Sequence, residues 1–255
     1  MKSLKNLFFA GLAVLTITFA ACKNDGGSPS PSVDDPLDTP VDLLDTLLDT
    51  LGDLDQAKVT GQPDISVTGA ALGGDKVGNV TITGGNEADG YNLSVTGGKL
   101  TLNLTTPTNL GNESDQQGHF PGLKIMLLGS TDAAPEGTFN PSDAEFCFCS
   151  SFSGTGDGST YYVYRYAAQT GAETYFVDIT IHYVYVDKDC SIISAAKDIS
   201  GTDDGVAWTD HYDKVDLSLK TGWNLIQVNR NGTEKGMTVT VKIADKDIPW
   251  EIYKN

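Results

Sequence analysis

The stretch Tyr175–Asp187 reads YFVDITIHYVYVD and is the most regular segment of the chain. β-Branched and aromatic residues recur along it with a period of two, which is typical of a strand with one face in a core. The residues that we expect on that face are Tyr175, Val177, Ile179, Ile181, Tyr183 and Tyr185. A strand over Thr160–Ala167 precedes the segment, so Gln169–Glu173 predicts the turn of a hairpin.

Similar short segments, separated by Gly, Asn and Asp, continue in both directions from this hairpin. The further strands that we expect are Ile65–Thr68, Val77–Thr83, Tyr91–Thr96, Lys99–Thr105, Leu123–Gly129, Ala144–Phe152, Ser191–Ile199, Val215–Leu219, Trp223–Asn229, Met237–Ile243 and Ile248–Tyr253. Gly97-Gly98 and Lys220-Thr221-Gly222 predict hairpin turns, because glycine supplies the positive φ that such turns need. No helical period follows Gly52.

Regular short strands with turns between them predict an all-β fold, an antiparallel β-sandwich over residues 58–255. The polar segment 107–121 could divide this region into two small sandwiches. We favour one domain, because the part before this segment has few aromatic residues for a core of its own.

The N-terminal segment, residues 1–21, has the order of a secretory signal peptide: Lys2 and Lys5, an apolar run, then Ala20-Ala21 before Cys22. It resembles a bacterial lipoprotein signal peptide. That resemblance implies cleavage before Cys22 and acylation of Cys22, with palmitate among the chains, so that the protein is membrane-anchored. The alternatives are a transmembrane helix, for which the run falls short of about 20 residues, and secretion with soluble release.

Residues 22–57 predict a flexible acidic tether rich in Gly, Ser, Pro and Asp, a composition that buries little apolar surface. A short helix is expected at 40–51, because Leu44, Leu47, Leu48 and Leu51 share one helical face. It is either a partly ordered spacer or a helix that packs on the domain or on lipid.

The formal net charge of the 255-residue chain is −17. Lys2 and Lys5 are the only charged residues of the signal segment, so its removal takes the charge to −19. An acidic surface is repelled by phosphate backbones and anionic lipid head groups. Nucleic acid is therefore excluded as a partner, and membrane association has to come from the acyl chains.

Three histidines, His119, His182 and His211, are the candidates for acid–base chemistry. On the predicted strand, Asp178 and His182 are four residues and so about 13 Å apart, too far for a catalytic dyad. No Gly-x-Ser-x-Gly, phosphate-binding glycine loop or HExxH motif occurs. We expect no catalytic residues and no cofactor, and the alternative is a hydrolase whose triad is assembled from distant residues.

The cysteines other than Cys22 are Cys147, Cys149 and Cys190. An exported protein can form disulfides, so Cys147 or Cys149 could pair with Cys190; buried free thiols are the alternative. The Cys-x-Cys spacing does not match a zinc site. The aspartates of the segments 187–189 and 203–204 could hold calcium, but turn aspartates are usually solvated, and we expect no metal.

Aromatic residues provide the one candidate binding face. Tyr162, Tyr164 and Tyr166 alternate on one predicted strand, and Trp208 and Trp223 could join them. Such side chains combine a large apolar area with a polar group, which suits a glycan or protein ligand. Packing in the core or at a sheet edge is the competing explanation.

The segment Val184–Asn229 contains YVYVDKDCSI and VDLSLKTGWNLIQVN. It resembles a pattern of uncharacterised envelope lipoproteins of spirochaetes and related bacteria, and Lys23 after Cys22 resembles the outer-membrane sorting class. These resemblances imply an outer-membrane lipoprotein facing the periplasm or the cell surface. Together with the strands they predict a non-enzymatic binding or adhesin-like module; a structural envelope component is the alternative.

Overall fold

The computed structural model describes residues 40–75, 77–111, 137–171, 175–203, 205–233 and 235–255. The predicted signal peptide, Cys22, His119, the strand Leu123–Gly129 and most of the segment 107–121 lie outside the described residues.

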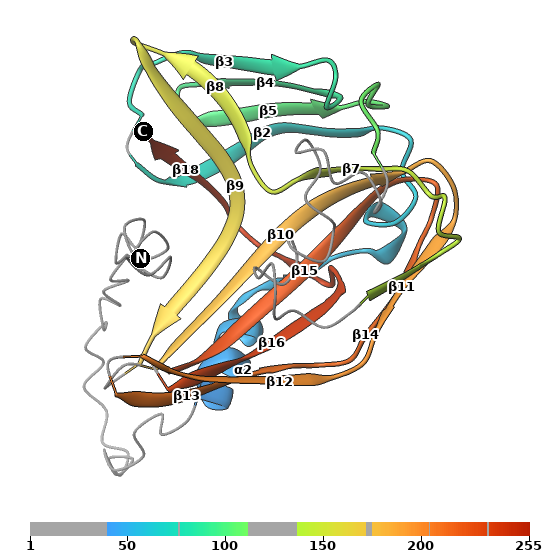
Figure 1. Ribbon diagram of the computed structural model, residues 1–255. Coiled ribbons are helices and arrows are strands. Elements are labelled where there is room, and N and C mark those ends of the chain that lie inside the picture. Colours follow the sequence, from blue (N-terminus) through green and yellow to red (C-terminus); the bar gives the residue numbers. More distant parts are fainter. Residues whose placement is uncertain (1–39, 76, 112–136, 172–174, 204, 234) are drawn as a thin grey trace, which may run out of the picture. The chain divides into compact units, whose positions relative to one another are not determined.

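The segment Phe176–Val186 forms β10, a long central strand that pairs with three other strands (Figure 1). One edge pairs along its whole length with β15 (Gly222–Thr233). The other edge pairs first with β9 (Ser159–Thr170) and then with β7 (Phe146–Cys149). The predicted strand and its hairpin with the preceding strand are confirmed.

Both faces of β10 are buried, whereas the sequence predicted one core face. Ile179, Ile181 and Tyr183 lie in one hydrophobic cluster, as predicted. Val184 and Val186, on the opposite face, lie in a second cluster. Because strands that pair on both edges and pack on both faces are central, β10 separates the two cores.

Seven strands close into a ring on one side of β10. The ring starts at β9 and returns to it through β18 (Trp250–Lys254), β2 (Ile65–Gly74), β5 (Lys99–Leu104), β4 (Tyr91–Thr96), β3 (Ile82–Asn86) and β8 (Phe152–Gly156). Leu93, Leu100 and Leu102 fill its inside together with the core residues of β9 and β10. Where β3 meets β8, a Cβ at Gly84 would lie 2.1 Å from the carbonyl oxygen of Ser153, so only glycine allows this approach.

The second core lies between two sheets. In the first sheet, β15 is followed across the sheet by β16 (Gly236–Ile243), β13 (Val206–Tyr212) and β12 (Lys197–Asp203). A separate sheet of β14 (Val215–Leu219), β11 (Cys190–Ser194) and β6 (Gly137–Asn140) packs against them through Ile192, Leu217 and Leu219. The predicted all-β fold of packed sheets is confirmed.

The turn at Lys220-Thr221-Gly222 does not form the predicted hairpin. β14 pairs with β11, and β15 pairs with β10 and β16, so the chain crosses between sheets at this point. Gly222 has a φ of +107°, and the Asn224 amide donates to the carbonyls of Lys220 and Gly222. This side chain supplies the hydrogen bonds that a hairpin would have made.

Further strand predictions differ from the structure. The predicted strand Ala144–Phe152 is divided into β7 and β8, and of the predicted strand Val77–Thr83 only Ile82 and Thr83 lie in a strand, β3. The predicted strand Ser191–Ile199 is divided into β11 and β12, which belong to different sheets. Residues 137–140, where the sequence predicted no strand, form β6, which pairs with β11. Short β1 (Gly52–Asp53) pairs with β17 (Lys246–Asp247), and a 3₁₀ turn, η2, spans Gln56–Lys58.

Helix α2 spans Pro40–Thr50 and packs on the β domain. Leu43 is fully buried, and a Cβ at Gly171 would come within 2.8 Å of its side chain. Leu44, Leu47 and Leu48 pack against the first core. The compact unit therefore includes α2, before the predicted boundary at residue 58, because these leucines need the sheet to cover them.

No helix among the described residues is long and apolar enough to cross a membrane.

Candidate functional site

The three candidate tyrosines lie on one face of β9, but they do not form a flat platform. Tyr162, Tyr164 and Tyr166 are each half-buried. The rings of Tyr164 and Tyr166 are 6.0 Å apart and inclined by 59°. Burial raises the pKa of both tyrosines above the usual value. Stacking of the apolar face of a sugar ring needs an exposed, flat aromatic surface, which this arrangement does not offer.

The two tryptophans lie elsewhere. Trp223 is fully buried in the first core, where its indole N–H donates to the carbonyl of Thr105 at 3.1 Å. It is therefore part of the core and not of a binding face, because β10 and the ring enclose it. Trp208 is half-buried on β13, and β16, β15 and β10 separate that strand from β9.

The three described cysteines are free and buried. Cys147 and Cys149 lie in the first core, whereas Cys190 lies in the second. The predicted disulfide to Cys190 does not form, because the sheet of β7 and β10 stands between the two positions. The pKa of Cys149 is raised by its hydrogen bond with Cys147 and by burial, and burial raises the pKa of Cys190 to about 11.

The two described histidines lie in different surroundings. His182 is 5% exposed, and Asp178 lies instead against Arg230, at 3.4 Å. His211 is exposed between Asp198, at 2.5 Å, and Asp213, at 3.3 Å, and the hydrogen bond with Asp198 raises its pKa. Within the described ranges no three His, Cys, Asp or Glu side chains are placed to hold a metal ion.

A different set of residues forms a regular surface on the outside of the ring. The apolar side chains of β2, β5, β4 and β3 point inward, so the alternate residues point outward. Cross-strand pairing aligns the outward residues in two rows, which are Ser66, Asn103, Asn92 and Gly85, and Thr68, Thr101, Ser94 and Thr83. We call this surface the amide–hydroxyl face. None of its residues is charged or apolar.

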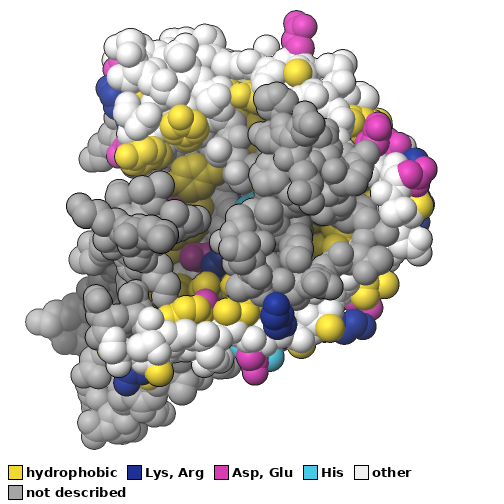
Figure 2. Space-filling model, in the orientation of Figure 1, with side chains coloured by type: hydrophobic (Ala, Val, Ile, Leu, Met, Phe, Trp, Pro, Cys, Tyr) yellow, Lys and Arg dark blue, Asp and Glu magenta, His cyan; other side chains and the backbone are white. Residues whose placement is uncertain are grey.

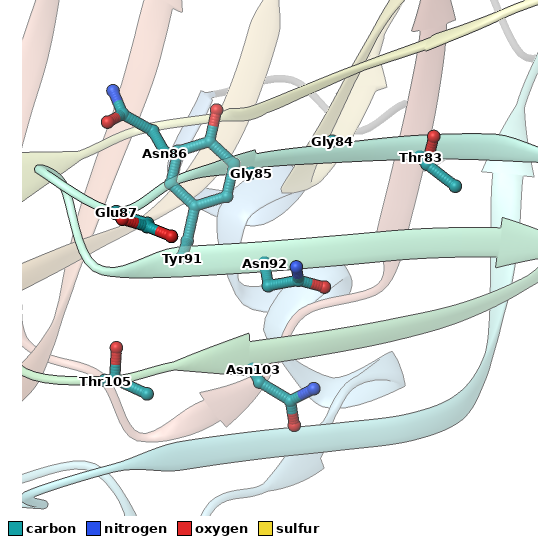
Figure 3. Close-up of a pocket in the computed structure, with 9 residues that line it drawn as sticks. All are labelled: Thr83, Gly84, Gly85, Asn86, Glu87, Tyr91, Asn92, Asn103 and Thr105. Carbon is teal, nitrogen blue, oxygen red and sulfur yellow. The ribbon is translucent and has the colours of Figure 1, made fainter.

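One end of this face is hollowed into an open pocket of about 600 Å³ (Figure 3). Thr83, Asn92, Asn103 and Thr105 line the sheet side, and Glu87 and Tyr91 line the end near the β3–β4 turn. The pocket also includes Gly84, Gly85 and Asn86. A Cβ at Gly85 would lie 3.5 Å from the amide nitrogen of Asn92, so the glycine leaves this amide uncovered.

The pocket combines fixed and free polar groups. The amide of Asn103 accepts a hydrogen bond from the hydroxyl of Ser66 at 2.9 Å, which orients it. The hydroxyl of Tyr91 lies 3.0 Å from the Ser153 hydroxyl. Within the described part of the chain, the side chain of Asn92 makes no hydrogen bond. An amide is both donor and acceptor, so Asn92 can bind a ligand hydroxyl in either role.

The surface over β3 and β4 is mainly white in Figure 2, where white marks the backbone and the side chains that are neither apolar, charged nor His. The lining has one charged side chain, Glu87. The chain as a whole carries a formal charge of −17. A pocket with amides and hydroxyls in place of charges favours an uncharged polar ligand over an ion.

Sequence reasoning did not select these residues. A pattern that could have indicated them is present in the strands YNLSVT and KLTLNL, whose outward positions hold only Asn, Ser, Thr and Lys. Such residues are also ordinary on a solvated sheet face. Only the pairing register brings Asn92 beside Asn103 and both beside Gly85.

No protein-family model, curated protein or solved structure matches the chain. The resemblance to envelope lipoproteins therefore stays a prediction from the sequence.

Proposed function

We propose that this protein is a lipid-anchored envelope protein whose β domain binds a neutral, polyhydroxylated ligand, a glycan, at the amide–hydroxyl face. The observation that carries the proposal is the two aligned rows of Asn, Ser and Thr side chains, hollowed at Gly85. The module is non-enzymatic and adhesin-like, held at the outer membrane by acyl chains on Cys22.

The chemistry of the pocket supports a sugar. Neighbouring hydroxyls of a sugar ring need donors and acceptors at short spacing, and Asn92, Asn103 and Thr83 offer them on three adjacent strands. Strands lie about 4.8 Å apart, so groups on adjacent strands can reach different hydroxyls of one ring. Tyr91 adds an aromatic edge at the end of the pocket.

Binding can be measured with the purified full chain on an array of bacterial and host glycans. Each net hydrogen bond contributes about 1 kcal/mol, so Asn92→Ala combined with Asn103→Ala should weaken binding about tenfold or more. Asn109→Ala, an exposed asparagine outside the pocket, is the matched control and should bind like the parent chain. Absence of glycan binding, or equal binding by the double variant, contradicts the proposal.

The anchor is tested separately, in cells. Incorporation of an alkyne-tagged palmitate analogue should label the parent chain and should be abolished by Cys22→Ala. Protease added to intact cells should remove the β domain if it faces outward. Survival of the domain until lysis would exclude an adhesin and leave a periplasmic binding role.

A further inference from the structure

A half-buried carboxylate without a counter-ion lies on the outside of the ring. It belongs to Glu251 on β18, the strand between β9 and β2 (Figure 1). Trp250 and Ile252, its neighbours in the strand, lie in the first core, so Glu251 points outward. Among the described residues it has neither a hydrogen-bond nor an ion-pair partner. Burial raises the pKa of Glu251 above the usual value, and a cation bound beside the carboxylate would offset this effect.

Two glycines of β2 allow this carboxylate to lie close along the sheet. Gly73 is the cross-strand partner of Glu251. A Cβ at Gly73 or at Gly74 would lie 2.8 Å from the Oε2 atom of Glu251, so a side chain at either position would displace the carboxylate. Gly73 is not at a positive φ. The close approach of the carboxylate is therefore the local feature that favours glycine at residue 73.

Three tyrosines lie beside the carboxylate. Tyr164 is the cross-strand partner of Glu251, and Tyr162 is the partner of Tyr253. All four side chains alternate with core residues of β9 and β18, so they share one outer face, which we call the tyrosine–carboxylate site. Tyr253 is 41% exposed, and Tyr162 and Tyr164 are half-buried. The pKa of Tyr164 is raised by burial and then by the charges of Glu251 and Asp75, as expected for a hydroxyl near negative groups.

The two basic residues of these strands are already paired. Lys254 lies 3.1 Å from Asp157, and Arg165 is buried on the core side of β9, where it pairs with Asp247. Neither strand therefore supplies a positive partner for Glu251. The formal charge of −17 on the chain adds to the attraction of a cation from solution.

We propose that the tyrosine–carboxylate site binds a methylated ammonium group, such as the trimethylammonium group of choline. The faces of aromatic rings and a carboxylate both attract such a cation. Inclined rings suit it, because each ring attracts the charge separately. A bare ammonium would bring three N–H groups that need acceptors, whereas a trimethylammonium group has none, so its burial against tyrosines leaves no donor unsatisfied. The site is separate from the amide–hydroxyl face, whose proposed ligand is uncharged.

Titration of the purified full chain with choline chloride, followed by saturation-transfer difference NMR at constant ionic strength, tests the proposal. We expect saturable binding. The uncharged isostere of choline, in which carbon replaces the nitrogen, should bind about tenfold more weakly, and methylammonium chloride should also bind more weakly. Absence of saturable choline binding, or equally tight binding of either comparison compound, overturns the proposal.

Substitutions locate the site. Glu251→Gln keeps the size of the side chain, removes its charge and should weaken choline binding about fivefold. Gly73→Ala should weaken it similarly, because the new Cβ displaces the carboxylate. Tyr253→Leu should weaken it about threefold, whereas Tyr253→Phe keeps the ring and should bind like the parent chain. Glu145→Gln, at an exposed position next to β7, is the matched control for charge and should also bind like the parent chain.

Tryptophan fluorescence checks that each variant is folded. Choline binding that is unchanged by both Glu251→Gln and Tyr253→Leu refutes the site. Equal weakening by Glu145→Gln and Glu251→Gln would show that only the net charge of the chain matters, and refutes the site as well.

Discussion

His182 is a buried polar side chain whose replacement should stabilise the protein. The ring stacks on Phe148 with centroids 5.1 Å apart. Among the described residues, neither ring nitrogen has a hydrogen-bond partner. Burial, and the nearby charge of Arg230, lower its pKa to about 3. We choose His182→Leu, which has a similar volume and no polar atoms.

The stability gained by His182→Leu has a part that is independent of pH and a part that depends on pH. The first part is itself the balance of two terms. An unsatisfied buried polar group costs about 1–3 kcal/mol, and the lost ring stacking offsets about 0.5–1.5 kcal/mol of that gain. The net gain at pH 7.5 is therefore about 1 kcal/mol. The second part depends on pH, because the folded pKa lies below the unfolded value of 6.5. Below pH 6.5 the unfolded chain protonates this histidine but the folded chain does not. The free energy of unfolding of the parent chain is therefore unaffected by this group above pH 6.5 and falls as the pH drops from 6.5 toward 3.

Between pH 7.5 and pH 5, this proton linkage should cost the parent chain about 2 kcal/mol that the His182→Leu variant does not lose. Any folded pKa below about 4 gives nearly the same difference, so the result does not depend on the depth of the shift.

Urea unfolding followed by tryptophan fluorescence, at pH 7.5 and pH 5, measures both parts. The other titrating groups cancel in the difference between parent and variant. His211→Gln is the control, because the hydrogen bond with Asp198 raises the pKa of His211. Its contribution is present below the unfolded pKa and lost as the pH rises, so this variant should be relatively less stable at pH 5. Parallel pH profiles for the parent and His182→Leu would refute the reasoning, since His182 would then bind protons when folded.

Two substitutions test how the ring closes at β3 and β8 and how the chain crosses between sheets at Gly222. Gly84→Ala should lower the free energy of unfolding by about 1–3 kcal/mol, because its Cβ would meet the carbonyl of Ser153 at 2.1 Å; Gly52→Ala, which has 3.8 Å of space, should be nearly neutral in the same urea titration. Asn224→Ala removes a fully buried amide that bonds both the N–H and the C=O of Lys220 and should cost about 2–4 kcal/mol. An Asn224 variant as stable as the parent would show that the crossing between sheets does not depend on this side chain.

Local features of the fold could be predicted from the sequence. The strand Tyr91–Thr96 has the predicted bounds, and Gly97 and Gly98 both have positive φ in the turn that follows. The alternation in β10 correctly placed Ile179 and Ile181 on a core face. Such features depend on the side-chain period and on glycine's freedom at positive φ, which are properties of a few neighbouring residues.

Strand partners could not be predicted in the same way. The glycine at residue 222 indicated a change of direction, but a tight turn and a crossing between sheets both use a positive φ. The sequence alone did not decide whether Trp223 is a surface or a core residue. In the structure it lies in the first core. The polar positions of β3, β4 and β5 were visible, but their alignment into one face depends on the register between strands.

By itself, therefore, the sequence determined an all-β chain, the period of its strands and a net charge of −17. The tertiary structure alone decided that β8 closes on β9, that β10 is buried on both faces, and that Asn92, Asn103 and Gly85 meet in one pocket. The physical reason is that alternation specifies which residues share a face. Which face is covered, and by which strand, depends on contacts between residues far apart in the chain.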